Sequence, residues 1–320
     1  MTTKEKILTL LENNKGIYYS GEQLARKLKI SRTSIWKAIN SLRKDGYQID
    51  AITNKGYCLS VGNDIISLQG IQKYLLPICS NLQFEIHKKV SSTNTIARQM
   101  ALEGAKEGYV IIANGQDNGK GRLGRNFFSP EQTGIYMSII LRPQDPKLAS
   151  TFTTIAAVAA CEAIESNSNK QAKIKWVNDI FIDGKKVSGI LTEAVYSLEN
   201  GLLEYAILGI GLNVYPPQEG FPIELQDIAG SVFNQVHNDA KNRLIASFLN
   251  QFMQYYQTND NYLDKYRNRS FIIGKKITIQ KNNSTRLATA LKINDNCHLV
   301  VKYPDGKIET LKAGEISIKL

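Results

Sequence analysis

The first sixty residues carry apolar side chains at two different spacings. Until about residue 44 the spacing is helical and predicts three short helices, because positions three and four apart share one helical face. The second helix opens with the capping-box pattern Ser20-Gly-Glu-Gln23, and Ser31 is the expected N-cap of the third. After Gly46 the spacing changes to two, which predicts a hairpin across a turn at 53–56. The positions expected to face inward are Ile7, Leu10, Leu11, Leu24, Leu28, Ile35, Ile39, Leu42, Tyr47, Ile49 and Ala51.

Helix, helix, turn, helix and hairpin is the order of a winged helix-turn-helix, whose third helix enters the major groove of DNA. Charge supports this interpretation. Residues 1–62 hold eleven Lys or Arg against five Asp or Glu, so +6 of the chain's net +11 lies there, and such a segment is attracted to polyanions. A small helical domain used for protein contact is the alternative. The residues expected to face DNA are Ser31, Arg32, Thr33, Trp36, Lys37 and Lys55.

Length and composition bound the rest of the chain. A chain of 320 residues with 42% hydrophobic residues predicts several folded domains rather than one core. The polar N-terminus lacks the apolar core of a signal peptide, and the apolar stretch at 155–161 is too short to span a bilayer. We therefore expect a cytoplasmic protein without a membrane partner. The four cysteines are widely spaced, which favours reduced thiols over disulfides or a zinc site.

After a short linker at 62–64 the pattern changes to longer alternating strands and helices. A strand at 83–90 leads through Ser91-Ser-Thr-Asn94 into a helix at 95–102, and another strand is expected at 108–113. Further strands are expected at 174–182, where polar Asn178 and Asp179 interrupt the apolar run, at 185–191 after a turn at 183–184, and at 203–211. Beyond Arg269, short strands at 276–280, 285–293, 298–303 and 307–311 predict a small β-barrel.

The segment Asn114-Gly-Gln-Asp-Asn-Gly-Lys-Gly-Arg-Leu-Gly-Arg125 contains four glycines and three cations. Glycines let the backbone approach a ligand closely, and the cations oppose negative charge, so the segment predicts an anion site. Its spacing is not that of a Walker A loop, and Gly209-Ile-Gly211 lacks the third glycine of a dinucleotide fingerprint. A flexible solvated loop would have the same composition.

Taken together, these motifs resemble the catalytic domain of biotin protein ligases, and with the winged helix the chain is similar to bifunctional ligases that repress biotin genes. The resemblance implies an α+β multidomain protein: a winged helix-turn-helix at 1–62, a catalytic α/β domain with a mixed sheet at 63–268 and an SH3-like domain at 269–320. The motifs that carry it are Ser92-Thr-Asn94, Gly119-Lys-Gly-Arg-Leu-Gly-Arg125, Lys175-Trp-Val-Asn-Asp179, Lys186-Val-Ser-Gly189 and Gly209-Ile-Gly-Leu-Asn213.

The resemblance also implies a reaction. Biotin and ATP form biotinyl-5′-AMP and pyrophosphate with Mg²⁺, and the biotinyl group passes to a lysine of a biotin carboxyl carrier protein, in acetyl-CoA carboxylase or pyruvate carboxylase. Biotinyl-5′-AMP would act as corepressor, favouring a homodimer that presents two recognition helices about 34 Å apart to a palindromic operator.

Site residues follow from the same resemblance, position by position. Lys120, Arg122 and Lys186 are expected to be catalytic. Biotin is expected to contact Ser92, Thr93, Asn94, Gln116, Lys120, Gly121, Arg122, Lys186 and Gly189. ATP is expected to contact Arg122, Arg125, Phe127, Asn178, Asp179 and Asn213, and Asp179 is the candidate Mg²⁺ ligand.

Three positions depart from the common family pattern, and several alternatives stay open. Lys120 stands where Arg is frequent, Phe127 where Trp often occurs, and Val177 where Pro is usual. An ion pair between Asp179 and Lys175 would shape the fold instead of contacting ligand, and Arg125 would order the loop instead of contacting phosphate. At the level of function, the alternatives are a ligand-sensing transcription factor without turnover and a lipoate or octanoate ligase.

Overall fold

The computed structural model describes residues 1–143, 151–197, 199, 201–258, 261–281, 284–312 and 315–317. The chain forms two compact units. The first unit comprises Met1–Leu76 and Gln235–Ala246, and the second unit comprises Pro77–Asn234 and Ser247–Leu320. Among the described residues, no helix combines the length and apolar character needed to cross a membrane.

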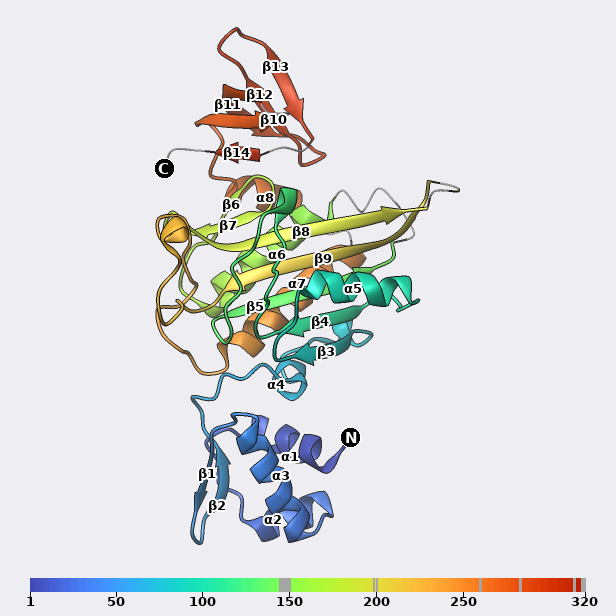
Figure 1. Cartoon of the computed structure of the whole chain (residues 1–320), viewed down its shortest axis with the longest axis vertical. Coiled ribbons are helices and arrows are strands. Elements are labelled where there is room, and N and C mark those ends of the chain that lie inside the picture. Colours follow the sequence, from blue (N-terminus) through green and yellow to red (C-terminus); the bar gives the residue numbers. More distant parts are fainter. Residues whose placement is uncertain are drawn as a thin grey trace. The chain divides into compact units, whose positions relative to one another are not determined.

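The first unit begins with the predicted winged helix-turn-helix (Figure 1). Both predicted caps are present: Ser20 and Gln23 form a reciprocal capping box, and Oγ of Ser31 accepts a hydrogen bond from the backbone of Ser34. The predicted apolar face forms the core, except that Ala51 is exposed near the tip of the hairpin. The elements of this unit are α1 (Thr3–Glu12), α2 (Gly21–Leu28), α3 (Arg32–Lys44), β1 (Ile49–Ile52), β2 (Gly56–Leu59) and α4 (Leu68–Gln72).

A cluster of buried charges joins three segments of the first unit. The carboxylates of Glu12 and Asp239 are almost completely buried, and each contacts the ammonium groups of both Lys15 and Lys73. Oδ2 of Asp239 also accepts a hydrogen bond of 2.7 Å from the hydroxyl of Tyr74. The cluster therefore ties α1 to the segment after α4 and to the segment that precedes α7 (Ala240–Thr258).

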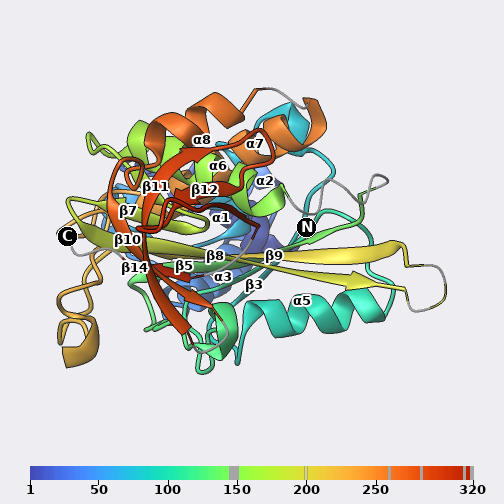
Figure 2. The ribbon, with the colours of Figure 1, turned by 90° about the horizontal axis from the view of Figure 1, so that it is seen from above.

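The second unit is built on a sheet of seven described strands in the order β3-β4-β5-β9-β8-β7-β6. The pair β3 and β4 is parallel and the other pairs are antiparallel. Helices α6, α7 and α8 lie on one side of this sheet and α5 lies on the other, as Figures 1 and 2 show from two directions. The elements are β3 (Gln83–His87), α5 (Thr93–Leu102), β4 (Tyr109–Ala113), β5 (Gly134–Leu141), α6 (Phe152–Asn167), β6 (Lys173–Lys175), β7 (Asp179–Ile182), β8 (Lys185–Tyr196), β9 (Leu203–Asn213) and α8 (Leu263–Arg269).

The core of the second unit explains this layering. Every residue of β5 is buried, as expected for a central strand covered on both faces. On one face, α5 packs Ala97 and Ala101 against Ile111, Ile140 and Ile207 of the sheet. The expected strand at 174–182 is instead the hairpin of β6 and β7, whose turn is formed by 176–178 and includes Asn178, while Asp179 begins β7.

The C-terminal strands form a separate antiparallel sheet of five described strands, in the order β13-β12-β11-β10-β14. The four predicted strands are present and β14 is additional. The described strands form an open sheet rather than a closed barrel, which is consistent with an SH3-like domain. Nε1 of Trp176 donates to the carbonyl oxygen of Cys297 at 2.9 Å and links this sheet to the central one. The strands are β10 (Lys276–Lys281), β11 (Ser284–Ile293), β12 (Leu299–Lys302), β13 (Ile308–Leu311) and β14 (Glu315–Ser317).

All four cysteines lie in the described ranges and are buried free thiols. Burial raises the pKa of the Cys79 thiol to about 11, which leaves it uncharged at neutral pH. Their burial agrees with the interpretation of reduced core residues.

The buried charge cluster predicts a pH-dependent stability of the first unit. Burial alone would raise the pKa of Asp239, but hydrogen bonds from Lys73, Tyr74 and Asn242 and the charge of Lys15 lower it from 3.8 to about 2. Because the folded pKa lies below the unfolded one, the carboxylate stabilises the fold above about pH 4, and this contribution is lost as the pH falls towards 2.

Asp239→Asn should therefore destabilise the first unit by about 3 kcal/mol at pH 7, because it leaves two buried ammonium groups undercompensated. Hydrogen exchange of the α1 amides should accelerate by about two orders of magnitude at pH 7, with a smaller difference at pH 3. Asp45→Asn, which breaks the more exposed pair with Lys4, is the matched control. Equal exchange in the two variants would contradict the prediction.

Candidate functional site

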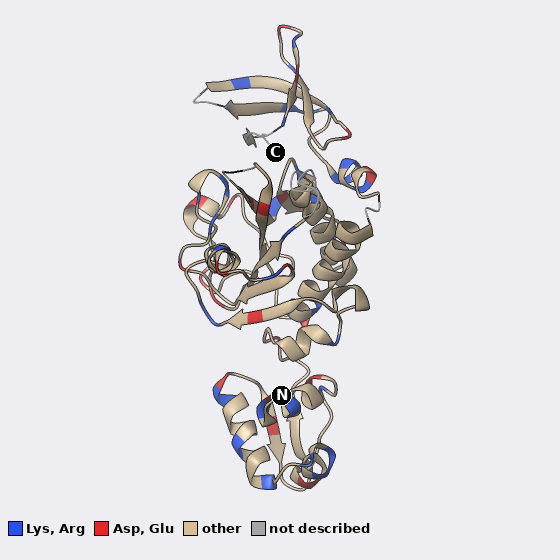
Figure 3. Ribbon diagram, turned by 90° about the vertical axis from the view of Figure 1, so that its right-hand side faces the viewer, with Lys and Arg blue, Asp and Glu red and all other residues tan. Residues whose placement is uncertain are grey.

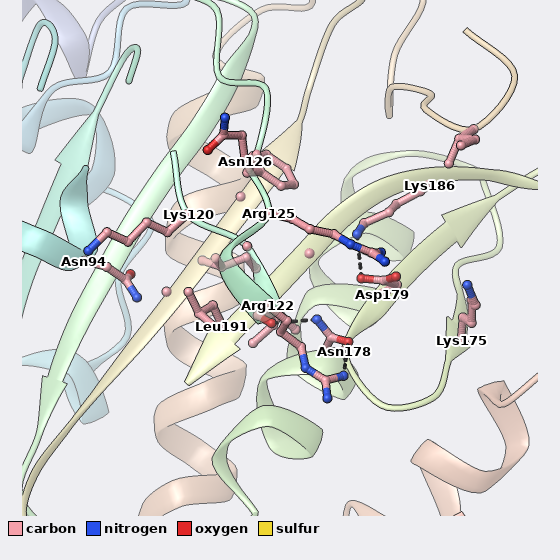
Figure 4. Close-up of a pocket in the computed structure, with 18 of the residues that line it drawn as sticks. Asn94, Lys120, Arg122, Arg125, Asn126, Lys175, Asn178, Asp179, Lys186 and Leu191 are labelled. Atoms are coloured by element: carbon pink, nitrogen blue, oxygen red, sulfur yellow. Dashed lines mark hydrogen bonds and ion pairs between the residues drawn. The ribbon is translucent and has the colours of Figure 1, made fainter. Parts of the chain in front are cut away.

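A pocket of about 390 Å³ opens on the face of the sheet that carries α5. Its walls come from the start of α5, the glycine-rich segment 114–133, the strands β7, β8 and β9, and the C-terminal strand β14. Figure 4 shows side chains from these segments converging on one space. The pocket therefore gathers residues that lie far apart in the sequence, from Ser92 to Ser317.

Two glycines of β9 form the floor and leave room for larger groups above them. A Cβ atom on Gly209 would lie 2.1 Å from Oδ1 of Asn94, and one on Gly211 would lie 2.4 Å from Cε1 of Phe127. Real Cβ atoms do not approach other atoms so closely. The glycines thus let the Asn94 amide and the Phe127 ring pack directly on the strand.

The glycine-rich segment has a defined path. Backbone hydrogen bonds join Asp117 and Asn118 to the segment before α5, and Phe127 donates to the carbonyl of Gly119 at 2.8 Å. At its tip, 122–124 form a short 3₁₀ turn in which Leu123 adopts a positive φ of 55°. The segment is held at both ends while its tip, with Lys120 and Arg125, stays exposed.

Positive charge dominates one end of the pocket. Among the described residues that line the pocket, five are cations (Lys120, Arg122, Arg125, Lys175 and Lys186) and one is a carboxylate, that of Asp179. Figure 4 shows Arg122, Arg125 and Lys186 around Asn178 and Asp179, whereas Lys120 extends towards Asn94. Nη1 of Arg122 donates to Oδ1 of Asn178 at 3.1 Å, and Nζ of Lys186 lies 2.6 Å from Oδ1 of Asp179; both contacts are drawn in Figure 4. An anionic ligand would be attracted to this end.

The opposite end, called the polar end below, is formed by buried side chains that carry no charge, and Lys120 extends towards it (Figure 4). Oε1 of Gln116 accepts a hydrogen bond of 2.8 Å from the backbone of Thr93, and Nε2 of Gln116 donates to Oγ of Ser129 at 3.0 Å. Ser92, Thr93 and Asn94 are all buried. Preset hydrogen-bonding groups of this kind suit a neutral ligand with its own donors and acceptors.

The structure brings together all but one of the predicted biotin and ATP residues. The exception is Asn213, which is not among the described lining residues and donates from Nδ2 to the carbonyl of Gly230 at 3.0 Å. Asp179 pairs with Lys186, whereas Lys175 is its cross-strand neighbour and lies 6.0 Å from the ring centre of Phe181. Trp176 and Ile210 also line the pocket and lie inside the quoted motifs, although no role was predicted for them. Lining residues outside the motifs are Asn126, Ile190, Leu191, Leu225, Ile228, Gln280, Ile316 and Ser317.

Most of the lining residues without a predicted role fall into two groups. Those on β8 and β9 alternate with predicted positions, so the two-residue period of a strand could have indicated Leu191. Gln280, Ile316 and Ser317 belong to the C-terminal sheet, and no local signal shows that this sheet reaches the pocket.

The predicted DNA-facing residues lie on the surface of the first unit. Arg32, Thr33, Trp36 and Lys37 are exposed on α3, and Trp36 keeps 57% of its surface accessible, which is unusual for so large an apolar group. Lys55 is exposed in the turn of the hairpin. The Lys and Arg positions of this unit are blue in Figure 3.

Comparisons with known proteins agree with this geometry. Residues 86–213 match the biotin/lipoate A/B protein ligase family, and residues 3–58 match a helix-turn-helix domain family. The bifunctional ligase/repressor BirA of Bacillus spizizenii is 32% identical over 99% of this chain and 99% of its own length. This chain belongs to the same family of bifunctional ligase/repressors. BirA of Bacillus subtilis is 38% identical over 72% of this chain and 71% of its own.

Solved structures show the same fold for the ligase part of this ligase/repressor. The biotin protein ligase of Aquifex aeolicus in complex with biotin and ATP aligns with a TM-score of 0.60 and 22% identity. The alignment covers 73% of this chain and 97% of that one.

The glycine floor of the ligase pocket predicts the effect of one added methyl group. In Gly211→Ala the new Cβ would displace the Phe127 ring, and such overpacking costs about 1 to 3 kcal/mol. We expect the KM for ATP in biotin-dependent pyrophosphate release to rise by about tenfold or more. Gly62→Ala is the control, because its Cβ would meet only Oγ of Ser60, at 3.7 Å. An unchanged KM in Gly211→Ala would show that Phe127 does not contact nucleotide.

Proposed function

We propose that the pocket of the second unit binds biotin and ATP side by side and joins them as biotinyl-5′-AMP. The biotinyl group then passes to a lysine of a biotin carboxyl carrier domain, such as that of acetyl-CoA carboxylase or pyruvate carboxylase. The observation that carries this proposal is that one pocket has an end of buried polar groups and an end at which most of its cations gather.

The polar end suits the ureido ring of biotin. Ser92, Thr93, Asn94 and Gln116 converge there, and Gly121 and Gly189 also line the pocket. The dithiolane ring of lipoate has no N–H or carbonyl, so it would displace water from these groups without replacing its hydrogen bonds, which is unfavourable by about 1 to 3 kcal/mol for each group left unpaired. The pocket therefore favours biotin over lipoate.

The cationic end suits the reaction itself. A carboxylate oxygen of biotin attacks the α-phosphorus of ATP, a new P–O bond forms, and the bond to pyrophosphate breaks. Lys120, Arg122 and Lys186 reduce the repulsion between the two anions and stabilise the charge that builds in the transition state. A single such donor contributes roughly 3 to 4 kcal/mol in other enzymes.

The second step needs no further cofactor. The neutral amine of the carrier lysine attacks the carbonyl carbon of the mixed anhydride, an amide forms, AMP leaves, and the amine loses a proton. Arg125 and Phe127 are assigned to the nucleotide, with Phe127 stacking on adenine.

The donor groups of the pocket fit Mg²⁺ only when it arrives with nucleotide. Within the described residues, no three His, Cys, Asp or Glu side chains gather to form a metal cage. Mg²⁺ bound to phosphates needs only one or two protein carboxylates, and Asp179 supplies one once Lys186 turns from it to the ligand. Asn178 is held by Arg122 and by the carbonyl of Ile190, so we assign it to orienting Arg122.

The ligase proposal predicts a large loss in Arg122→Ala. Biotin-dependent pyrophosphate release should fall by a factor of about 10² to 10³, because a cation at the reacting phosphate is removed. Lys170→Ala, at the loop between α6 and β6, is the control and should keep wild-type turnover. Wild-type protein that releases no pyrophosphate with biotin would refute the ligase proposal. Equal turnover in both variants would refute the role of Arg122.

We propose that the first unit binds operator DNA through α3 and the wing, and that biotinyl-5′-AMP acts as corepressor by favouring a homodimer. The exposed basic and aromatic residues on α3 support a contact with the major groove. Because operator DNA and ATP share the cytoplasm, we place the protein there. Sedimentation that gives the same oligomer with and without biotin and ATP would contradict the dimer.

DNA binding should depend steeply on salt. On a fluorescent duplex that carries the promoter of the biotin synthesis genes, raising salt from about 50 to 200 mM should weaken binding by about three orders of magnitude. Arg32→Ala should weaken binding by about tenfold or more, since it removes a contact from the recognition helix. Lys4→Ala is the control, because Lys4 lies on α1 and is paired with Asp45. A flat salt response in an anisotropy titration would contradict the proposal.

A further inference from the structure

A chain of polar groups continues from the polar end of the pocket into the sheet. Oγ of Ser138, a fully buried residue of β5, lies 2.7 Å from Oγ1 of Thr93 and 2.6 Å from Oδ1 of Asn94. Nδ2 of Asn94 donates to Oε2 of Glu193 on β8 at 2.7 Å. Thr93 and Asn94 line the pocket, and Ser138 and Glu193 contact them from the sheet.

The number of available protons decides which atom donates each hydrogen bond in this chain. The carboxylate of Glu193 can only accept, so Asn94 turns its NH₂ group towards Glu193 and its carbonyl oxygen towards Ser138. That carbonyl oxygen can also only accept, so the hydroxyl of Ser138 donates to it. Ser138 is also the donor in its contact with Thr93, so the carbonyl oxygen of Asn94 and the hydroxyl oxygen of Thr93 compete for this one proton.

The hydroxyl of Thr93 makes a third contact, to the side chain of Gln116. Oγ1 of Thr93 also lies 3.2 Å from Oε1 of Gln116, so two hydroxyl protons serve three oxygen pairs. The hydroxyl of Thr93 is the donor to Gln116, and the shorter of the two Ser138 contacts is the one to Asn94. Because the carbonyl oxygen of Asn94 draws the proton of Ser138, a lone pair on the Thr93 hydroxyl stays open to an outside donor.

Packing fixes the middle of the chain. The Asn94 amide rests on Gly209, where a side chain would collide with it, and Asn94 is 5% exposed. The amide of Gln116 is fixed separately, because its Nε2 donates to Ser129. The polarity of the pocket wall is therefore set inside the sheet, with the negative charge of Glu193 at its end.

We propose that Glu193 is a positioning residue for biotin. Acting through Asn94 and Ser138, its carboxylate holds the Thr93 hydroxyl as a hydrogen-bond acceptor, which pairs with a ureido N–H of the ligand. This inference rests on the proposed function. It adds a source of selectivity for N–H donors that lies outside the pocket lining.

The test is a double-mutant cycle on the full-length protein, read as the Kd of biotin by calorimetry. Glu193→Ala and Ser138→Ala should each weaken biotin binding about tenfold, and the double variant should be no weaker than either, because both break one chain. Glu193→Gln keeps an acceptor oxygen and should restore most of the affinity. Glu204→Ala, with an exposed carboxylate on neighbouring β9, is the matched control.

A second measurement separates positioning from folding. Wild-type protein should prefer biotin over derivatives methylated on a ureido nitrogen, and this preference should shrink about tenfold in Glu193→Ala while the KM for ATP stays unchanged. Multiplicative losses in the double variant, or an unchanged preference, would overturn the inference while leaving the ligase proposal intact. Wild-type protein that does not bind biotin would overturn the ligase proposal and the inference with it.

Discussion

Close approach to the bare backbone of β9 is the constraint on which the site depends. Gly209 and Gly211 allow an amide and an aromatic ring to lie directly on the sheet, one at each part of the pocket. Because these two groups belong to α5 and to the glycine-rich segment, the floor brings together two motifs separated in sequence. Any side chain on either glycine would push one wall of the pocket outward, and the groups that must meet around the ligand would separate.

A structural feature of this protein could be predicted from the sequence when the residues that determine it lie within one short segment. The winged helix was predictable because its caps and apolar periods lie within short segments, and the glycine-rich segment was conspicuous in composition. Ser138 and Glu193 were not predicted, since one lies inside a continuously apolar strand and the other follows an unremarkable run of β8. Their roles depend on which residues lie opposite them on neighbouring strands. No local sequence pattern predicts this strand register.

The contribution of the C-terminal sheet to the pocket also could not be predicted from local sequence patterns. Its four longer strands have clear two-residue periods, but β14 is three residues long and gave no signal. Nevertheless Ile316 and Ser317 of β14 line the pocket. Trp176 links the two sheets through one hydrogen bond, and the hydroxyl of Tyr266 holds the same turn through the carbonyl of Val177 at 3.0 Å. The turn that carries Asn178 is therefore positioned by a part of the chain that follows it by about a hundred residues.

The two units use buried and half-buried charge in opposite ways. In the first unit, two carboxylates and two ammonium groups compensate one another, so the cluster is nearly neutral and serves the fold. In the second unit, five cations among the described lining residues share one carboxylate, and Lys120 and Arg125 remain exposed to water. Water lowers the cost of this excess charge in the empty pocket. When a ligand displaces that water, the same cations interact with its negative charge in a lower dielectric, where each contact is stronger. The excess of positive charge is therefore tolerable before binding and becomes useful only when anions arrive.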